Sequence, residues 1–309
     1  MAEFIDDSID FSAYIQEPTI RQYVRPASSY VDEVVEQFLS PDEQRGCYLP
    51  WSKTNALFRI RPGELTLWPG INGHGKSALL GQIMLACMAQ GERVLVASME
   101  MRPRQTLQRM TRQVTRGASP TVSAIREFHS WSDGRLWLYD HYGATQWTQL
   151  LAVFRYCVDK LAINQFVIDS LMRCAIREDD YNEQKAFLDA LCNFKHDNNV
   201  SVHLVMHSRK REDEMHPPGK FDAKGTGTMT DLADNVLTVW RNKAKERAVE
   251  KAGASIPMDV AEQPDTLIIC DKQRNFDWEG RIALWYHRES MQFVERRDAS
   301  PGELMEFMA

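Results

Sequence analysis

The feature that most constrains the fold is a glycine-rich loop that joins a β-rich run to an apolar helical run. In such a loop the glycines let backbone N–H groups approach phosphates, the lysine supplies a charge to the β- and γ-phosphates, and the hydroxyl ligates Mg²⁺. A chance glycine-rich turn is the alternative, but the strand before the loop and the helix after it are the context that the motif requires. The loop therefore predicts an α/β fold that binds a nucleoside triphosphate with Mg²⁺ as cofactor. It reads G-x-x-x-x-G-K-S and consists of Gly70, Ile71, Asn72, Gly73, His74, Gly75, Lys76 and Ser77.

From Gly63 onward, short β-rich runs alternate with helical patterns, which is typical of a mostly parallel sheet with crossover helices. Helices are expected in most gaps among the first five strands, and the last three strands are expected to form an antiparallel extension. The expected strands are 65–68, 93–97, 136–139, 166–168, 202–206, 236–240, 266–270 and 282–287.

The sequence predicts three parts: a short N-terminal arm and linker helix at 1–45, a main domain at 46–297 and a C-terminal tail at 298–309. Ser29 with Asp32 fits a capping box at the start of the helix, and Pro41 ends it. Periodicity does not name the surface that this helix covers, so packing on its own domain and docking on a neighbouring subunit both stay open. The apolar stripe of the helix consists of Val31, Val34, Val35, Phe38 and Leu39.

Bulk composition narrows the class of protein. With 309 residues, 43% of them hydrophobic and 26% charged, the chain is long and apolar enough to bury one large core. No apolar run approaches the roughly 20 residues that cross a bilayer, and the start lacks the regions of a signal peptide, so a cytoplasmic protein without membrane contact is expected.

The six cysteines include no C-x-x-C pair, which argues against a zinc ribbon or a disulfide framework. The net charge of -6 argues against a wholly basic nucleic-acid binder, but it permits DNA contact through a few inner loops of a ring.

Polar side chains follow three of the expected strands. Glu100, Asp169 and His207 come just after the second, fourth and fifth of them. At the carboxyl edge of a parallel sheet, Glu100 could polarise an attacking water, Asp169 could hold Mg²⁺ in a Walker B pattern, and His207 could contact the γ-phosphate. Taken singly, such a glutamate is more often a solvated loop residue and such a histidine a capping or core residue. The N-K-x-D pattern of switch GTPases is absent.

A set of sequence blocks, in order along the chain, resembles the motor domain of DnaB-type replicative helicases, closest to the branch of phage primase-helicases and Twinkle. The resemblance implies a RecA-like core with Glu100 as catalytic base and His207 as γ-phosphate sensor. It also implies an ATP-hydrolysing DNA helicase of replication, a homohexameric ring on single-stranded DNA in a phage or bacterial host cytosol, with a separate primase or polymerase as a further candidate partner. The blocks lie between about 49 and about 294, at 50–51, 61–66, 72–77, 98–101, 140–143, 168–170 and 206–210.

Two downstream blocks carry the same resemblance. The first, the K-G-T-G-T-M run at 224–229, resembles the DNA-facing segment of the family. The K-Q-R-N run at 272–275 resembles the finger motif of the family, which implies that Arg274, with Lys272, reaches the ATP site of a neighbouring subunit. The resemblance also implies that Arg241 and Tyr286 flank the nucleotide base by stacking. Cations in a turn are more often solvated, and Tyr286 could equally be a core residue of the last strand.

The polar segment between His207 and Gly225 predicts DNA contact. It is long, proline-bearing and rich in cations, which fits a loop that tracks phosphates without reading sequence. A charge-mixed loop is more often only solvated, and the acids at 212–214 weaken the prediction. Asp231 stands where the family commonly carries a glutamine, which affects the coupling of DNA contact to hydrolysis. The candidate contacts are Arg209, Lys210, Arg211, Lys220 and Lys224.

Two other functions stay open. A RecA- or RadA-like recombinase or mediator shares the core but would form filaments, and the K-Q-R-N block and the helicase-like start at Pro50 favour the helicase. A non-translocating ATP switch or helicase loader would hydrolyse ATP without responding to single-stranded DNA.

Overall fold

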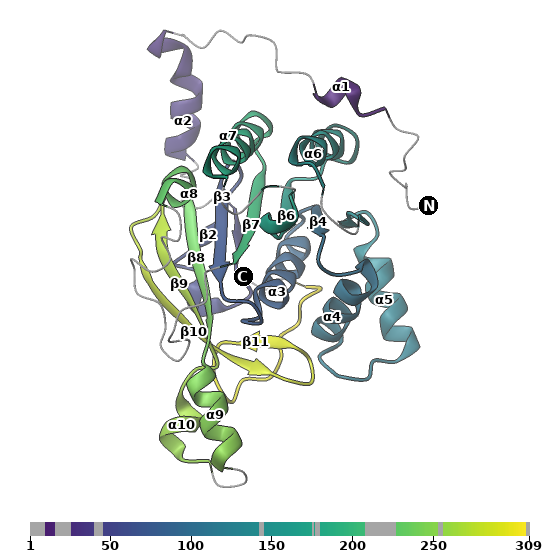
Figure 1. Cartoon of the computed structure of the whole chain (residues 1–309), viewed down its shortest axis with the longest axis vertical. Helices are drawn as coiled ribbons and strands as arrows, with labels where there is room; N and C mark the ends of the chain where they lie inside the picture. The colour runs from purple at the N-terminus through teal and green to yellow at the C-terminus, as the bar shows by residue number, and fades with distance from the viewer. Residues whose placement is uncertain are drawn as a thin grey trace.

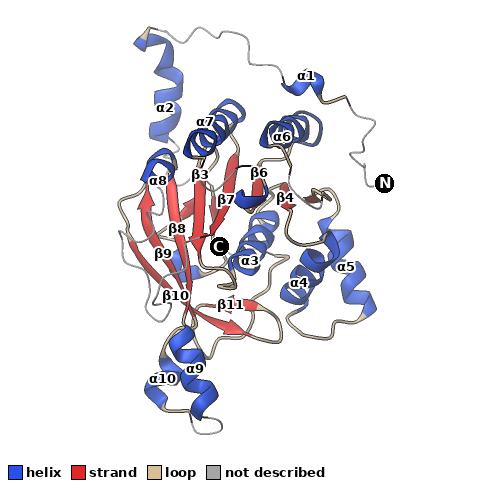
Figure 2. Cartoon of the chain, viewed as in Figure 1, coloured by secondary structure: helices blue, strands red, loops and turns tan. Residues whose placement is uncertain are grey.

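The computed structural model describes residues 10–15, 26–39, 46–141, 145–174, 176, 180–207, 227–252 and 256–306. Their centre is a nine-stranded sheet with helices on both faces (Figure 1 and Figure 2), in the strand order β11-β10-β9-β8-β3-β7-β6-β4-β5. The strands of this sheet are β3 (Leu65–Gly70), β4 (Val94–Ser98), β5 (Leu136–Leu138), β6 (Gln165–Asp169), β7 (Ser201–His207), β8 (Asn235–Arg241), β9 (Thr266–Gln273), β10 (Gly280–His287) and β11 (Gln292–Val294).

The remaining elements frame this sheet. A separate antiparallel pair consists of β1 (Cys47–Tyr48) and β2 (Arg59–Ile60). The helices are α1 (Ser12–Ile15), α2 (Val31–Leu39), α3 (Lys76–Ala89), α4 (Pro103–Thr115), α5 (Val122–Ser132), α6 (Trp147–Leu161), α7 (Tyr181–Asn198), α8 (Gly227–Leu232), α9 (Lys243–Ala252) and α10 (Met258–Glu262).

The sheet changes from parallel to antiparallel at β8. From β5 through β4, β6, β7 and β3 to β8 each neighbouring pair is parallel, and β9, β10 and β11 follow in antiparallel order. The expected mostly parallel sheet with an antiparallel extension is confirmed. One detail is wrong: the strand expected at 236–240 belongs to the parallel part, because β8 pairs parallel with β3 and only its other edge is antiparallel. Strand β11 was not expected, since three residues are too few for a period-two pattern.

The two faces of the sheet carry separate halves of the core. Successive side chains of a strand point to opposite faces, and an interior parallel strand is covered on both. Leu65 and Leu67 of β3 pack with α6 and α7, whereas Trp68 packs with α3 and α4. All six residues of β3 are therefore buried, which places the loop after this strand on a rigid support.

Helix α2 begins at Val31, after a 3-10 turn that spans Ala27–Tyr30. The predicted start at Ser29 is therefore early, and the Ser29 hydroxyl donates to the carbonyl of Pro26. The apolar stripe of α2 faces solvent: the side chains of Phe38 and Leu39 are 81% and 78% exposed, and the three valines are at least half exposed. Of the two alternatives left open, packing of this stripe on its own domain is therefore not seen among the described residues.

The C-terminal residues pack on the domain. Leu304 is buried in the same half of the core as α3, and the backbone N–H of Gly302 donates to Gln292 Oε1 at 2.9 Å. In the described ranges, no helix combines the length and apolar character needed to span a membrane.

A buried polar chain connects three strands on the α3 side of the sheet. Trp68 Nε1 donates to His203 Nδ1 at 3.2 Å, and the other ring nitrogen of His203 lies 3.2 Å from Gln165 Oε1. These partners fix the neutral Nε2–H tautomer, because Nδ1 must accept and the amide oxygen cannot donate. Burial lowers the pKa of His203 to about 3.

We predict that His203 makes the fold sensitive to mild acid. The unfolded chain binds a proton near the ordinary histidine pKa and the folded chain does not, so stability is lost as pH falls below about 6.5. Between pH 6.5 and 5 the free energy of unfolding should fall by about 2 kcal/mol more in the wild type than in His203→Gln, measured by urea denaturation. As a control, substituting the exposed His196 by Gln should leave the pH dependence of the free energy of unfolding as in the wild type. An equal pH dependence in the wild type and in His203→Gln would contradict the prediction.

Candidate functional site

The polar residues that follow the parallel strands meet at one edge of the sheet. Asp169 ends β6 in register with Ser98 of β4, and His207 ends β7 in register with Gly70 of β3. Glu100 lies just past the end of β4. The carboxyl ends of parallel strands share one edge, so topology alone brings these groups together beside the loop that leads into α3.

Two glycines of the loop are required by its geometry. A Cβ on Gly70 would lie 2.5 Å from the carbonyl oxygen of Val239 on the neighbouring strand β8. Gly75 has a φ of +85°, in the left-handed region, and directly precedes the first residue of α3. The loop is thus packed closely against β8 at its start and turns directly into the first residue of α3 at its end.

Three side chains form a connected group at the sheet edge. The hydroxyl of Ser170 donates to Glu100 Oε1 at 2.7 Å, and His207 Nε2 lies 3.1 Å from the same oxygen and 3.0 Å from Ser170 Oγ. The Lys76 ammonium lies 3.4 Å from His207 Nδ1. A carboxylate only accepts, so His207 carries its proton on Nε2 and presents Nδ1 as an acceptor toward Lys76. The phosphate-loop lysine and the candidate base therefore contact opposite sides of one imidazole.

Lys76 is buried and satisfied by its own loop. Its ammonium donates to the carbonyl oxygens of Gly70 and Ile71 at 2.6 and 3.0 Å. Burial lowers the pKa of Lys76 to about 8, and the negative charges of Asp169 and Glu100 oppose this shift. The side chain is held next to the space where phosphates would lie.

Ser77 and Asp169 provide the oxygen ligands that suit Mg²⁺. Burial raises the pKa of Asp169, and a hydrogen bond with Ser77 opposes that shift. Across the described ranges, no cluster of three or more His, Cys, Asp or Glu side chains could hold a metal by itself. A hydroxyl and one carboxylate, completed by phosphate oxygens and waters, are the ligands typical of a nucleotide-bound Mg²⁺, so these residues fit the expected cofactor.

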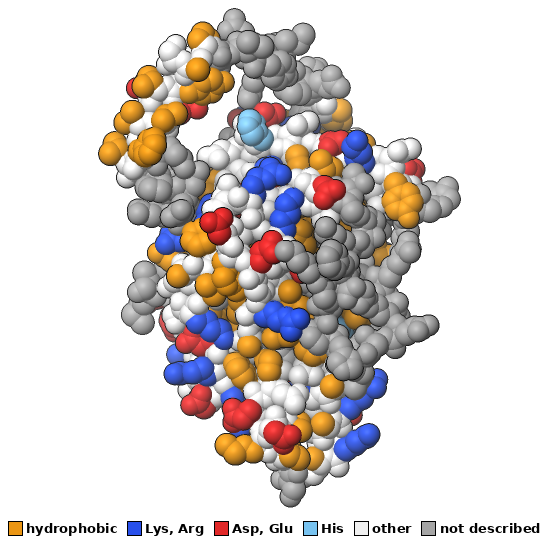
Figure 3. Space-filling model, turned by 90° about the vertical axis from the view of Figure 1, so that its left-hand side faces the viewer, with side chains coloured by type: hydrophobic (Ala, Val, Ile, Leu, Met, Phe, Trp, Pro, Cys, Tyr) orange, Lys and Arg blue, Asp and Glu red, His pale blue; other side chains and the backbone are white. Residues whose placement is uncertain are grey.

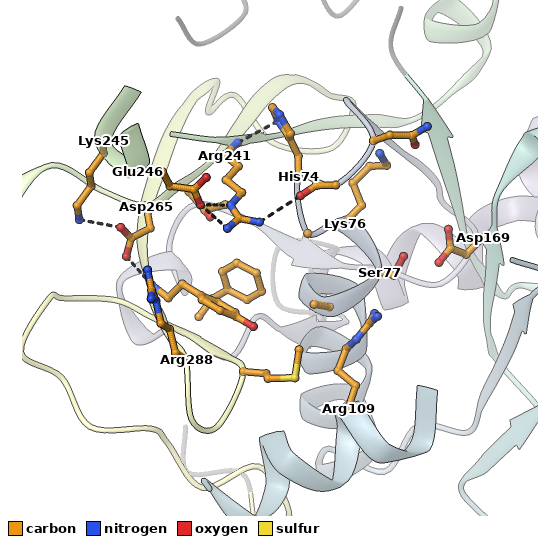
Figure 4. Close-up of a pocket in the computed structure, with 18 of the residues that line it drawn as sticks. His74, Lys76, Ser77, Arg109, Asp169, Arg241, Lys245, Glu246, Asp265 and Arg288 are labelled. Carbon is orange, nitrogen blue, oxygen red and sulfur yellow. Dashed lines mark hydrogen bonds and ion pairs between the residues drawn. The ribbon is translucent and has the colours of Figure 1, made fainter. Parts of the chain in front are cut away.

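A cavity of about 530 Å³ extends from this edge toward α9 and β10 (Figure 4). At its far end Arg241 pairs with Glu246 of α9, and one guanidinium nitrogen lies 3.4 Å from the carbonyl oxygen of Gly73. The ring of Tyr286 lies 5.1 Å from that of Phe293, between core and cavity. The predicted residues that line the cavity are Asn72, Gly73, His74, Gly75, Lys76, Ser77, Glu100, Asp169, His207, Arg241 and Tyr286.

Several lining or supporting residues were not predicted. Ser170 belongs to a recognised block but had no assigned role, although it joins Glu100 to His207. Arg109 of α4 and Glu246 of α9 belong to no motif. Their contribution depends on how α4 and α9 fold back over the cavity, which spacing along the chain does not reveal.

Lys272 and Arg274 lie at the opposite edge of the sheet, where the parallel strands begin and not where they end. Strand β9 is antiparallel to β8, with Thr266 opposite Arg241 at the cavity end and Gln273 opposite Asn235 at the far end. The predicted strand end at 270 is therefore too early, and Lys272 lies within β9. About seven residues of extended strand, roughly 20 Å, separate these cations from the cavity of their own chain.

Both cations have partners at that edge. Arg274 pairs with the buried carboxylate of Asp234 at 2.9 Å. The Lys272 ammonium donates to the carbonyl oxygens of Thr230, Asp231 and Ala233 at 2.9, 3.0 and 2.7 Å, and so caps the C-terminus of α8. In this conformation both side chains stabilise the start of β8.

The predicted DNA contacts lie outside the described residues. This applies to Arg209, Lys210, Arg211, Lys220 and Lys224. Tyr142 and Gly143 of the family block at 140–143 also lie outside the described residues.

Comparison with known proteins places this geometry in a family. Residues 53–213, more than half of the chain, match the AAA domain family. A solved ATPase domain superimposes with a TM-score of 0.71 at 16% identity, over 88% of this chain and 99% of that one. A structure described as a DnaB-like replicative helicase and its interactions with primase superimposes with a TM-score of 0.65 at 16% identity, over 88% of this chain and 67% of that one. The chain therefore belongs to the AAA domain family, and its fold is the RecA-like fold of the ATPase domain of DnaB-like helicases.

Proposed function

We propose that the protein is an ATP-hydrolysing DNA helicase motor that acts as a ring, with six subunits expected, on single-stranded DNA during replication. One observation carries the proposal: the groups for phosphate binding and water activation gather at one edge of the sheet, while the finger cations lie at the other edge. A chain built this way completes its site only when a second copy supplies its opposite edge.

In this proposal each residue of the cavity has a separate role in ATP hydrolysis. Lys76 would exchange its loop carbonyls for the β- and γ-phosphates, and Ser77 and Asp169 would hold a Mg²⁺, which would supply positive charge to the phosphates. Glu100 accepts a proton from the attacking water, because its carboxylate is fixed by Ser170 yet one-third exposed toward the cavity. His207 contacts both Lys76 and Glu100, so loss of the γ-phosphate changes the contacts of His207 at the start of the segment proposed to touch DNA.

Two features support assembly into a ring. Arg274 is too far from its own cavity to act there, and a cation supplied by a neighbouring subunit can be worth about 10³–10⁵ in rate in related phosphoryl-transfer sites. The exposed apolar stripe of α2 gathers at one end of the molecule (Figure 3). An isolated helix with such a stripe gains stability by burying it on a partner surface.

The remaining parts of the proposal follow the solved relatives. The description of one of them names a replicative helicase and its interactions with primase. By analogy we propose single-stranded DNA as substrate, a separate primase or polymerase as partner, and the cytoplasm of a phage-infected or bacterial cell as location. The segment at 208–226 would supply Arg209, Lys210, Arg211, Lys220 and Lys224 to the DNA, and Arg241 and Tyr286 would stack on the base.

We predict that nucleotide affinity falls above pH 8. The ammonium form of Lys76 binds phosphate, and with a pKa of about 8 in the free protein its protonated fraction drops about eightfold from pH 7.5 to 9. The affinity for ADP, measured by calorimetry with Mg²⁺, should fall by about the same factor. Lys76→Ala should bind weakly with no such dependence, and a wild-type affinity that stays constant over this range would refute the assignment.

A subunit-mixing experiment tests the shared site. Glu100→Gln and Arg274→Ala should each abolish most ATPase activity. In a random mixture about a quarter of the interfaces join an intact Glu100 to an intact Arg274, because each interface pairs unlike edges of two subunits. The mixture should recover activity well above that of either variant alone.

The control for this experiment is Arg281→Ala, which removes an exposed arginine from β10 and should leave ATPase activity unchanged. Mixed assemblies are verified by co-purification of differently tagged variants. If they form and activity stays at the level of the separate variants, the two edges do not share one active site.

A further inference from the structure

One of the finger cations holds the end of a short helix. Helix α8 has six residues, so its own hydrogen bonds are few, and the last carbonyl groups of any helix lack a partner within it. The Lys272 ammonium supplies that partner. It donates to the carbonyl oxygens of Thr230 and Asp231 in the last turn and of Ala233 just beyond the helix, at 2.9, 3.0 and 2.7 Å. Helix α8 therefore depends on a side chain that the proposed function assigns to the nucleotide of a neighbouring subunit.

The other finger cation can leave its partner without stranding a buried charge. Arg274 Nη1 lies 2.9 Å from Asp234 Oδ1, and the arginine side chain is 53% exposed. The second carboxylate oxygen, Oδ2, lies 2.7 Å from the Lys195 ammonium and accepts the backbone N–H of Leu65 at 2.8 Å. Removing one partner of a buried ion pair is strongly destabilising when the remaining charge is left uncompensated. Here Lys195 keeps the charge of Asp234 compensated, so Arg274 can exchange this carboxylate for another anion.

Positive charge is concentrated at this edge of the sheet. Lys272 donates to neutral carbonyls; burial lowers its pKa and the charge of Arg274 lowers it further, while Asp231 and Asp234 oppose the shift. A partly desolvated cation gains by exchanging neutral acceptors for an anion, because charge-assisted hydrogen bonds are the stronger ones. A phosphate group presented by a neighbouring subunit is therefore a better partner for both finger cations than the groups that hold them here.

We propose that the carbonyl end of α8 and Asp234 together form a resting site for Lys272 and Arg274, and that a nucleotide bound by the neighbouring subunit competes with this site for the two cations. The proposal rests on the shared ATP site of the proposed function and adds a regulation of that site. When both cations move to the phosphates, α8 loses the group that caps its C-terminus and becomes less stable.

The place of α8 in the chain gives this exchange a consequence for DNA contact. Helix α8 begins at Gly227, directly after the segment at 208–226 that is proposed to touch DNA. His207, which precedes that segment, contacts the phosphate-binding group of its own subunit through Lys76. One end of the DNA segment therefore responds to the nucleotide of its own subunit, and the other end responds to the nucleotide of the neighbour.

The test is hydrogen–deuterium exchange of the α8 amides, measured by mass spectrometry with and without a non-hydrolysable ATP analogue and Mg²⁺. In wild-type rings the analogue should speed this exchange about tenfold, because each lost hydrogen bond to a charged group destabilises the helix. Lys272→Met should exchange fast before the analogue is added and show no further change. Arg281→Ala is the matched control, since it removes an exposed cation from the adjacent strand β10 and should respond as the wild type does.

A mixed ring shows which nucleotide acts on α8. Isotopically labelled Lys76→Ala subunits, which should bind nucleotide weakly, are combined with an equal amount of unlabelled wild-type subunits, and co-purification verifies the mixture. About half of the labelled subunits then supply their cations to a wild-type neighbour. The labelled α8 should exchange faster with the analogue in the mixture and should stay unchanged in rings of Lys76→Ala alone. The resting site itself is unaltered here, so the result does not depend on how well Lys272→Met folds.

The alternative outcomes separate the resting site from the proposed function. If wild-type α8 responds to the analogue but labelled α8 in the mixture does not, the nucleotide of the same subunit acts on the helix and the proposal is overturned. Unchanged or slower exchange in wild-type rings that bind the analogue in calorimetry would overturn the resting site and leave the ATP site standing. A wild-type protein that binds no analogue, or forms no ring, would overturn the proposed function itself.

Discussion

The structure depends on the confinement of one ammonium group, that of Lys76, at the carboxyl edge of the parallel sheet. A buried cation must be solvated by the protein, and here two loop carbonyls and the imidazole of His207 do so. The glycines of the loop make this possible because larger residues would hold the backbone away from β8. From Lys76 the contacts continue through His207 to Glu100 and Ser170, so the groups proposed to bind phosphate and to activate water share one set of hydrogen bonds.

The reversal of chain direction after β8 has the complementary effect. Because β9 is antiparallel, it begins at the cavity and ends at the far edge of the sheet, where Lys272 and Arg274 hold α8 and Asp234. Binding and finger groups of one chain therefore face away from each other. In a ring of such chains, each nucleotide would bridge two subunits, and the contacts of Arg274 with Asp234 would have to exchange for phosphate contacts.

The sequence was most informative where a single local pattern determines geometry. The phosphate loop, the acid that ends β6 and the alternation of strands and helices are local signals, and the structure shows each of them in place. The edge location of Lys272, the salt bridge between Arg241 and Glu246 and the inward aim of Arg109 arise from long-range packing of α4, α9 and β9. Such contacts join residues far apart in the chain, and no short motif encodes them. The exposure of α2 was likewise undecidable, since an amphipathic pattern is the same whether the helix packs on its own domain or on another chain.

The most direct measurement of the central claim, that ATP hydrolysis at this edge drives movement along DNA, is unwinding of a forked duplex by the wild-type protein. With ATP and Mg²⁺, strand separation should proceed when one of the two single-stranded tails is present and should stop when ATP is replaced by a non-hydrolysable analogue. A protein that hydrolyses ATP at the same rate with and without single-stranded DNA, and separates no fork with either tail, would contradict the account.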